Sequence, residues 1–364
     1  MIMSPGDSKI RFKEEYRRYT AFKVLIIAIF IVLTIALFFV SITVGTRDLT
    51  ISQVYTFLLD HLSGATYDPS TQYELWYDDN IVWNYRLPRA IFAIIAGAGL
   101  SVAGVAMQSV MKNPLADPYT TGISSGALLG VALSMILGFD VGSGGSDGFG
   151  TVLNAMIFSM IPVMVIFVLS PMMRSPATLI LAGTAVSYLF SSLTSILMVS
   201  TDSETLASVY TWQVGSFSEI SWDAVPLVFV ICIAGTIVLM LLSNKLNLMT
   251  MSDKDAKALG LDGEKLRLVC LLVLSFMAAS IISYAGIIGF VGLIIPHMVR
   301  LAIGSDTRFV IPASLFIGAA FLLGCDIISR AVDVQAAIPV GVVSAFIGAP
   351  IFLYLIIREK RGIW

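Results

Sequence analysis

The sequence predicts an all-α polytopic membrane protein in which about ten helices cross the bilayer. Three observations support this class: 57% of the 364 residues are hydrophobic, only 13% are charged, and the mean hydropathy is +0.90. A soluble domain carries about 25% charged residues, so this composition excludes one. A helix needs about 20 apolar residues to cross the hydrocarbon core. The apolar segments are of that length and show no strand-like alternation that would indicate a barrel.

Ten apolar segments are the candidate spans. They cover residues 22–44, 90–110, 118–138, 151–170, 178–199, 224–243, 268–285, 287–303, 310–328 and 339–357. Backbone hydrogen bonding in lipid requires each of them to be helical. The seventh and eighth are the least clearly separated, because "ISYAGIIGFVGLIIPHMVR" continues with almost no polar break. Residues 1–21 form a polar tail, and residues 1–364 form a single transmembrane domain.

Lysine and arginine residues near the span ends indicate the orientation. Six of them, from Lys9 to Lys23, lie before or at the start of the first span. An even number of spans places the basic C-terminal residues 358–361 on the same side. Acidic residues dominate the opposite side, above all in the loop of residues 45–85. We therefore expect a multi-pass protein of the cytoplasmic membrane with both termini in the cytoplasm.

Ionisable residues are almost absent from the spans. Asp326 and Arg330 lie near the outer end of the ninth span, and His297 lies near the inner end of the eighth. A proton- or sodium-coupled carrier usually keeps such groups at mid-membrane, and the chain has no G-x-x-x-x-G-K-[ST] loop to hold ATP. The energy for transport is therefore expected from an external ATPase that docks on the cytoplasmic face. A secondary transporter or channel for a small solute is the alternative.

Two polar features are expected to face the cytoplasm. The stretch "KNPLADP" (112–118) separates the second and third spans, and its two prolines restrict the backbone. The loop of residues 243–267 predicts two short helices, with Gly260 ending one and Asp262 capping the helix of the seventh span. This loop is either an ordinary solvated segment or a rigid projection that fits into a groove of a partner protein.

Three arginines on the external side oppose the positive-inside trend. Arg86 and Arg89 precede the second span, and Arg330 follows the ninth. They either anchor the helices at the interface, pairing with local acids such as Asp333, or form a docking site for acidic side chains of an extracellular partner.

The pentapeptide "GISSG" (122–126) matches the nucleophile-elbow pattern G-x-S-x-G. That motif requires a strand–turn–helix context and a nearby histidine. Here it opens a membrane span, and His297 follows five spans later. Close helix packing or a polar path is therefore favoured over an intramembrane hydrolase. No basic cluster indicates a nucleic-acid partner.

Five stretches together resemble the FecCD/BtuC-type permeases of ATP-binding-cassette (ABC) importers. They are "RLPR", "GAGLSVAGVAMQSVMKNPLADPYTTGISSGALLG", "DAKALGLDGEKLR", "GIIGFVGLIIPHMVR" and "IPVGVVSAFIGAPIFLYLI". The resemblance implies a BtuC-like, type II importer fold with ten transmembrane helices. It also implies a permease homodimer, two ATPase subunits on the cytoplasmic side and an extracellular substrate-binding protein. ATP and Mg would be bound by the ATPase, so this chain would be no enzyme and would hold no cofactor or metal.

The resemblance assigns expected roles to individual residues. Arg86, Arg89 and Arg330 match arginines that meet glutamates of the binding protein. Asn113, Pro114 and Leu115 match a gate at the cytoplasmic mouth. Residues 247–267 match the coupling helices that sit in the ATPase groove, with contacts expected from Asp255, Ala256, Ala258, Leu259, Gly260 and Leu261.

Family members carry metal chelates, such as ferric siderophores, haem and cobalamin-type corrinoids, and some carry molybdate. None of the quoted residues distinguishes these cargoes. An iron chelate is favoured because it is the commoner cargo in the family.

Overall fold

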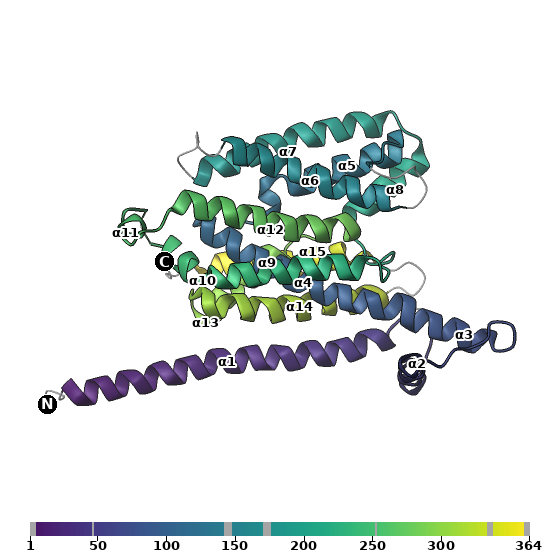
Figure 1. Ribbon diagram of the computed structural model, residues 1–364, viewed down its shortest axis with the longest axis horizontal. Coiled ribbons are helices and arrows are strands. Elements are labelled where there is room, and N and C mark those ends of the chain that lie inside the picture. The colour runs from purple at the N-terminus through teal and green to yellow at the C-terminus, as the bar shows by residue number, and fades with distance from the viewer. Residues whose placement is uncertain are drawn as a thin grey trace.

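The chain folds into a bundle of helices in the computed structural model, which describes residues 5–45, 47–141, 148–169, 176–251, 253–332 and 338–359. All regular structure in these ranges is helical (Figure 1). The α-helices are α1 (Pro5–Thr43), α2 (Ile51–Ser63), α3 (Tyr73–Asn80), α4 (Leu87–Met111), α5 (Ile123–Leu137), α6 (Phe149–Leu169), α7 (Pro176–Val199), α8 (Ser203–Val214), α9 (Ala224–Leu241), α10 (Ser243–Met249), α11 (Asp253–Ala258), α12 (Gly263–Ala285), α13 (Val291–Ile303), α14 (Thr307–Val332) and α15 (Val340–Glu359). A π-helical segment, η1 (Ile81–Arg86), joins α3 to α4, and a 3₁₀ turn, η2 (Pro118–Thr121), precedes α5.

The ten predicted spans are confirmed as apolar helices. Eight helices are long and apolar enough to cross a membrane: α1, α4 together with the preceding α3 and η1, α6, α7, α9, α12, α14 and α15. The two shorter apolar helices, α5 and α13, lie at the third and eighth predicted positions. The first helix starts at Pro5, so most of the predicted polar tail continues the first span as helix.

The third and eighth spans are shorter than predicted. With a rise of 1.5 Å per residue, α5 and α13 are about 22 Å and about 20 Å long, less than the roughly 30 Å hydrocarbon core. Residues 112–117 and the 3₁₀ turn η2 precede α5, and the non-helical residues 286–290 precede α13. The two segments meet, because the Tyr119 hydroxyl donates a hydrogen bond to the Ile288 carbonyl at 3.1 Å. Non-helical backbone is tolerated between spans when the protein itself satisfies it in this way.

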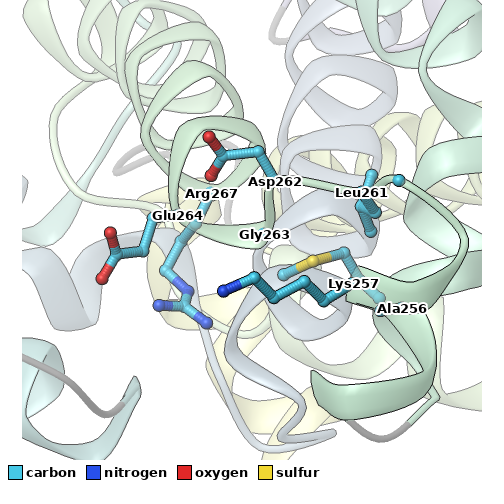
Figure 2. A pocket seen from close by; sticks show the side chains of 9 residues that line it. Ala256, Lys257, Leu261, Asp262, Gly263, Glu264 and Arg267 are labelled. Carbon is cyan, nitrogen blue, oxygen red and sulfur yellow. The ribbon is translucent and has the colours of Figure 1, made fainter.

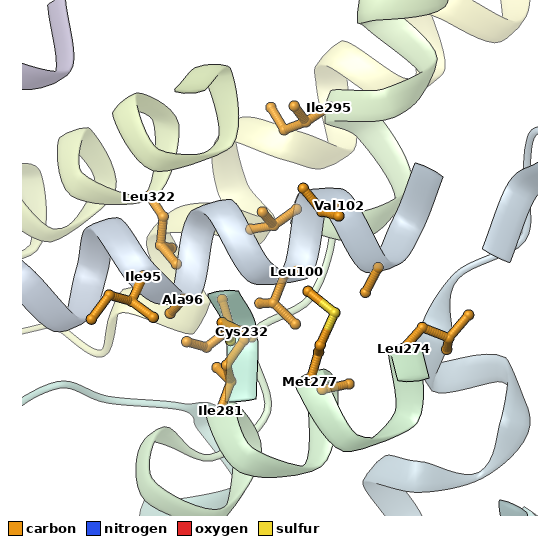
Figure 3. Packing of buried hydrophobic residues seen from close by; sticks show 14 of the residues in the cluster. Ile95, Ala96, Leu100, Val102, Cys232, Leu274, Met277, Ile281, Ile295 and Leu322 are labelled. Atoms are coloured by element: carbon orange, nitrogen blue, oxygen red, sulfur yellow. The ribbon is translucent and has the colours of Figure 1, made fainter. Parts of the chain in front are cut away.

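Helix α4 lies at the centre of the bundle. The continuous helical stretch Tyr73–Met111 contains an apolar window that is 83% buried. Its side chains pack against α9, α12, α13 and α14, with Leu100 and Val102 among residues such as Cys232, Met277, Ile295 and Leu322 (Figure 3). Glycines allow the closest approaches. A side chain at Gly97 would meet the backbone of Gly318, and one at Gly104 would meet the backbone of Gly292.

The predicted external loop of residues 45–85 is largely helical. Helix α2 is fixed at both ends, because Thr50 and Gln53 form a reciprocal capping box and Gly64 takes a left-handed conformation. Helix α3 and η1 then continue without a break into α4, so this helix projects well beyond the outer ends of the other spans (Figure 1).

Replacing Gly104 with alanine tests the close contact between α4 and α13. The new Cβ would meet the Gly292 backbone, and such overpacking costs about 1–3 kcal/mol. We expect the Gly104→Ala protein to unfold at a lower temperature in detergent. Gly324→Ala in α14 is the control, because a Cβ there meets nothing within 4 Å. Equal unfolding midpoints for the two variants would contradict this packing.

Candidate functional site

An arginine pocket lies at the N-terminal end of α4. Arg86, Arg89 and Arg330 converge on a cavity of about 340 Å³. Helix α14 contributes Arg330, and the other two arginines come from η1 and the first turn of α4. The remaining lining residues are Gly45, Tyr77, Asn80, Ile81, Tyr85 and Ser218. The structure therefore brings together the three arginines that the sequence singles out, although 244 positions separate the first from the last.

Two of these arginines hold the C-terminal end of α1. Arg86 donates to the carbonyl oxygens of Ile42 at 3.3 Å and Thr43 at 2.9 Å. Arg330 donates to the Ser41 carbonyl at 2.9 Å and to the Val44 carbonyl. The last carbonyls of a helix have no partner within it and favour positive charge. The two guanidinium groups therefore act as the C-terminal cap of α1.

The carboxylate of Asp326 contacts two of the three arginines. Asp326 is fully buried, and it accepts from Arg89 Nε and from Arg330 Nη2, both at 2.7 Å. The prediction of pairing with a local acid is thus met by Asp326, whereas Asp333 lies outside the described residues. Arg89 and Arg330 share this one carboxylate, and Arg86 donates to backbone carbonyl oxygens, so the three arginines carry more positive charge than Asp326 offsets.

The predicted gate residues lie in a compact turn after α4. Lys112 has a positive φ of 49° and ends the helix. Asn113 then accepts a hydrogen bond from the Leu115 amide at 2.9 Å through its side-chain oxygen, and its carbonyl accepts from the Ala116 amide at 3.1 Å. These bonds and Pro114 hold the turn in one shape, while the Leu115 side chain remains 46% exposed.

The loop of residues 243–267 contains the predicted helix before Gly260, α11, and leads into the predicted helix capped by Asp262, α12; α10 is an additional short helix. Gly260 takes a left-handed conformation after α11, and Asp262 caps α12 by accepting from the Lys265 amide at 3.1 Å, as expected. A cavity of about 580 Å³ lies beside the turn (Figure 2). Of the predicted ATPase contacts, Asp255, Ala258, Leu259 and Gly260 are exposed, whereas Ala256 and Leu261 are buried beneath the loop.

Hydrogen bonds tie this loop to the gate turn. The Lys112 ammonium donates to the Met251 carbonyl at 2.8 Å. The guanidinium of Arg267, at the start of α12, donates to the Val110 carbonyl in the last turn of α4 at 3.2 Å. Both partners on the gate side lie within three residues of Asn113. Sequence patterns gave no indication of these contacts, because they join residues more than 130 positions apart.

A second set of contacts ties the loop to the turn before α14. Asn247 in α10 donates to Asp306 at 2.9 Å and accepts from the Thr307 amide at 2.7 Å. Hydrogen bonds from Arg308, together with that of Asn247, lower the pKa of Asp306 to about 2. The Asp306 carboxylate is therefore negatively charged near neutral pH, where it accepts hydrogen bonds from Asn247 and Arg308.

The "GISSG" segment packs helices together. Ser125 donates to the Gly122 carbonyl at 2.9 Å, and Gly126 lies against the backbone of Phe158 in α6. The Ser125 hydroxyl group is thus bonded within its own helix. Among the described residues, no group of three or more His, Cys, Asp or Glu side chains could hold a metal ion.

Ten apolar helices, a helical loop at residues 243–267 and a charged pocket at the N-terminal end of α4 define a polytopic membrane protein. The chain belongs to the FecCD transport family, whose model matches residues 33–358. Its fold and the family agree with the predicted class of ABC importer permeases.

Named relatives come from several bacteria. The hemin transport system permease protein HmuU of Yersinia pestis is 33% identical, with 81% of this chain and 87% of the relative covered. The vitamin B12 import system permease protein BtuC of Klebsiella pneumoniae is 33% identical, covering 86% and 94%. The molybdate import system permease protein MolB of Haemophilus influenzae is 32% identical, covering 89% and 92%.

A solved structure supports the same fold. A metal-chelate type ABC transporter in an inward-facing conformation has a TM-score of 0.78 and 30% identity, covering 92% of this chain and 99% of that chain.

Replacing Asp326 with asparagine tests the buried charge cluster. Removing the carboxylate leaves the buried Arg330 and the partly buried Arg89 without their counter-charge, and breaking a buried pair typically costs about 3–5 kcal/mol. We expect a loss of that order in the free energy of unfolding in mixed detergent. Glu74→Gln is the control, because its pair with Arg47 is exposed and such pairs contribute about 1 kcal/mol or less. Similar losses for both variants would show that the cluster is not a buried network.

Proposed function

We propose that this chain is the membrane-spanning subunit of an importer that moves a metal chelate into the cytoplasm, driven by a separate ATPase. One observation carries the proposal: the arginine pocket and the gate turn lie at the two ends of a single buried helix, α4 (Leu87–Met111). The inner end of this stretch is hydrogen-bonded to the cytoplasmic loop that is exposed to partners.

The cytoplasmic step follows from these contacts. Asp255, Ala258, Leu259 and Gly260 offer an exposed surface to the ATPase, which binds ATP and Mg. Ala256 and Leu261 hold the loop to the bundle instead of touching the partner. A shift of the loop moves Met251 and Arg267, and their bonds pass the shift to residues 110–112. The rigid turn then carries Leu115 into or out of the inner mouth.

The transport path requires a second copy of the chain in this proposal. Helix α7 is poorly covered, since only 17% of its apolar window is buried. One face carries exposed hydroxyl groups at spacings of three, four and seven residues: Thr184, Tyr188, Ser191, Ser192 and Ser195. Thr184, Ser192 and Ser195 donate back to carbonyls of α7, which leaves their lone pairs facing outward. Such a mildly polar surface suits a path at a homodimer axis that binds cargo weakly.

The relatives guide the choice of cargo. Two of the named relatives are permeases for hemin and vitamin B12, and the similar solved structure is of a metal-chelate type transporter. We therefore infer a metal chelate, with a ferric siderophore or haem first and a corrinoid second. The MolB relative makes molybdate the alternative within the family.

Uptake into liposomes tests the function. The permease is reconstituted with its ATPase and its binding protein, and labelled ferric siderophore, haem, cobalamin and molybdate are offered outside. We expect uptake of one class only when ATP is present inside. Equal flux with and without ATP would contradict the importer and favour a channel or secondary transporter.

Charge at Ser218 tests whether the arginine pocket receives an acidic side chain of the binding protein. Ser218 lines the pocket and is exposed, so substitution there leaves the buried arginine contacts intact. Like charges at an interface cost several kcal/mol, so Ser218→Glu should weaken binding-protein affinity by about tenfold or more. Ser218→Gln is the matched neutral control. Equal affinities of the two variants, measured at low salt, would contradict docking at this pocket.

A further inference from the structure

Helix α2 is an amphipathic helix whose apolar face is not covered by any residue that the structure describes. Ile51, Leu59 and Leu62 are 66%, 67% and 72% exposed. Together with the half-buried Tyr55 they recur at positions i, i+4, i+8 and i+11. Residues at this spacing share one face of a helix.

The other side of α2 is fixed to the protein. Val54 and Phe57 are buried, and Phe57 packs edge-to-face on Tyr67 with ring centroids 5.7 Å apart. His61 stacks on Trp83 at 4.0 Å and contacts the Asp79 carboxylate at 3.2 Å. These contacts to the next loop, α3 and η1 determine which way α2 faces. They leave the face of Ile51, Tyr55, Leu59 and Leu62 free to meet another surface.

Tyr55 shows where that face points. Its hydroxyl donates to the Phe39 carbonyl at 3.2 Å, and its ring lies 6.0 Å from the Phe39 ring. Phe39 is in the last turns of α1, a span of which only 17% is buried, and its own side chain is exposed on the bundle surface. The apolar face of α2 is therefore continuous with the lipid-facing surface of α1.

The direction of α2 agrees with this placement. In Figure 1, α2 is seen nearly end-on beside the outer end of α1, while α1 and the other spans run across the picture. Helix α2 thus runs across the direction of the spans, as a helix lying along the membrane surface does. Tyrosine is also typical of the level where acyl chains meet headgroups.

We propose that α2 lies in the outer leaflet of the membrane, with Ile51, Leu59 and Leu62 inserted among the lipids at the headgroup–acyl boundary. The occupant of this face is the lipid surface, because the face continues one that already meets lipid. This inference depends on α1 being a membrane span and is independent of the cargo or the ATPase.

The composition of α2 defines the type of attachment. The segment Ile51–Ser63 contains no lysine or arginine, and Asp60 is its only acidic residue. Interfacial helices often gain binding from basic residues and anionic lipids, but α2 has only its apolar area. Its depth is therefore expected to be the same in zwitterionic and in anionic membranes.

Nitroxide labels on single cysteines test the proposal in the full-length protein in lipid vesicles. The three native cysteines are buried and do not compete for the label. Leu59→Cys and Leu62→Cys report on the apolar face. Thr56→Cys, on the side of α2, and Thr66→Cys, in the following loop, are exposed controls. The measurement is accessibility to oxygen, which concentrates in lipid, against a water-soluble nickel chelate.

We expect the oxygen-to-nickel ratio to be several-fold higher at residues 59 and 62 than at residues 56 and 66. The ratio should not change when phosphatidylglycerol replaces part of the phosphatidylcholine. High nickel accessibility at all four positions would overturn the proposal and place α2 in water. Protection of residues 59 and 62 from both reagents would also overturn it, since a protein surface would then cover the face. Because all four positions are exposed, the variants are expected to fold, and a normal elution volume in size-exclusion chromatography confirms that they do.

Discussion

The burial of α4 is the constraint on which the rest of the structure depends. A helix surrounded by four others cannot change its tilt without moving them. At Gly97 and Gly104 its backbone already lies directly against the neighbouring helices, so there is no space for a shift. Both candidate sites are attached to this helix, the arginine pocket at its outer end and the gate turn at its inner end. The two candidate sites are therefore joined through one rigid element.

The charge cluster at the outer end has two consequences. Arg86 and Arg330 use donor groups to cap α1, and Asp326 satisfies Arg89 and Arg330 from within the bundle. The arginines are therefore structural groups whether or not a partner is bound. An acidic side chain that enters the pocket would meet guanidinium groups that are already held in place, so little ordering would oppose its binding.

Hydropathy predicted all ten spans, because a lipid-facing helix must be apolar whatever its neighbours are. It did not predict the lengths of α5 and α13, since these helices begin only at Ile123 and Val291. The segments before them are held by tertiary contacts, such as the hydrogen bond from the Tyr119 hydroxyl to the Ile288 carbonyl, that hydropathy does not report. Helix α2 was predictable from Thr50, Gln53 and Gly64, which form a standard pair of end signals. The arginine contacts were not, because Arg330 and its partner Ser41 are 289 positions apart. Burial of Ala256 and Leu261 likewise depends on tertiary packing.

A cross-link shows whether the loop of residues 243–267 and the gate turn move together, as the proposed mechanism requires. Lys112→Cys and Met251→Cys replace two exposed residues whose native contact joins these segments. The two cysteines are joined with a short bifunctional maleimide in the reconstituted importer. If the two segments move as one, ATP-driven uptake continues at close to its original rate. Loss of uptake while ATP hydrolysis continues would contradict it, because the two segments would then have to separate during each cycle.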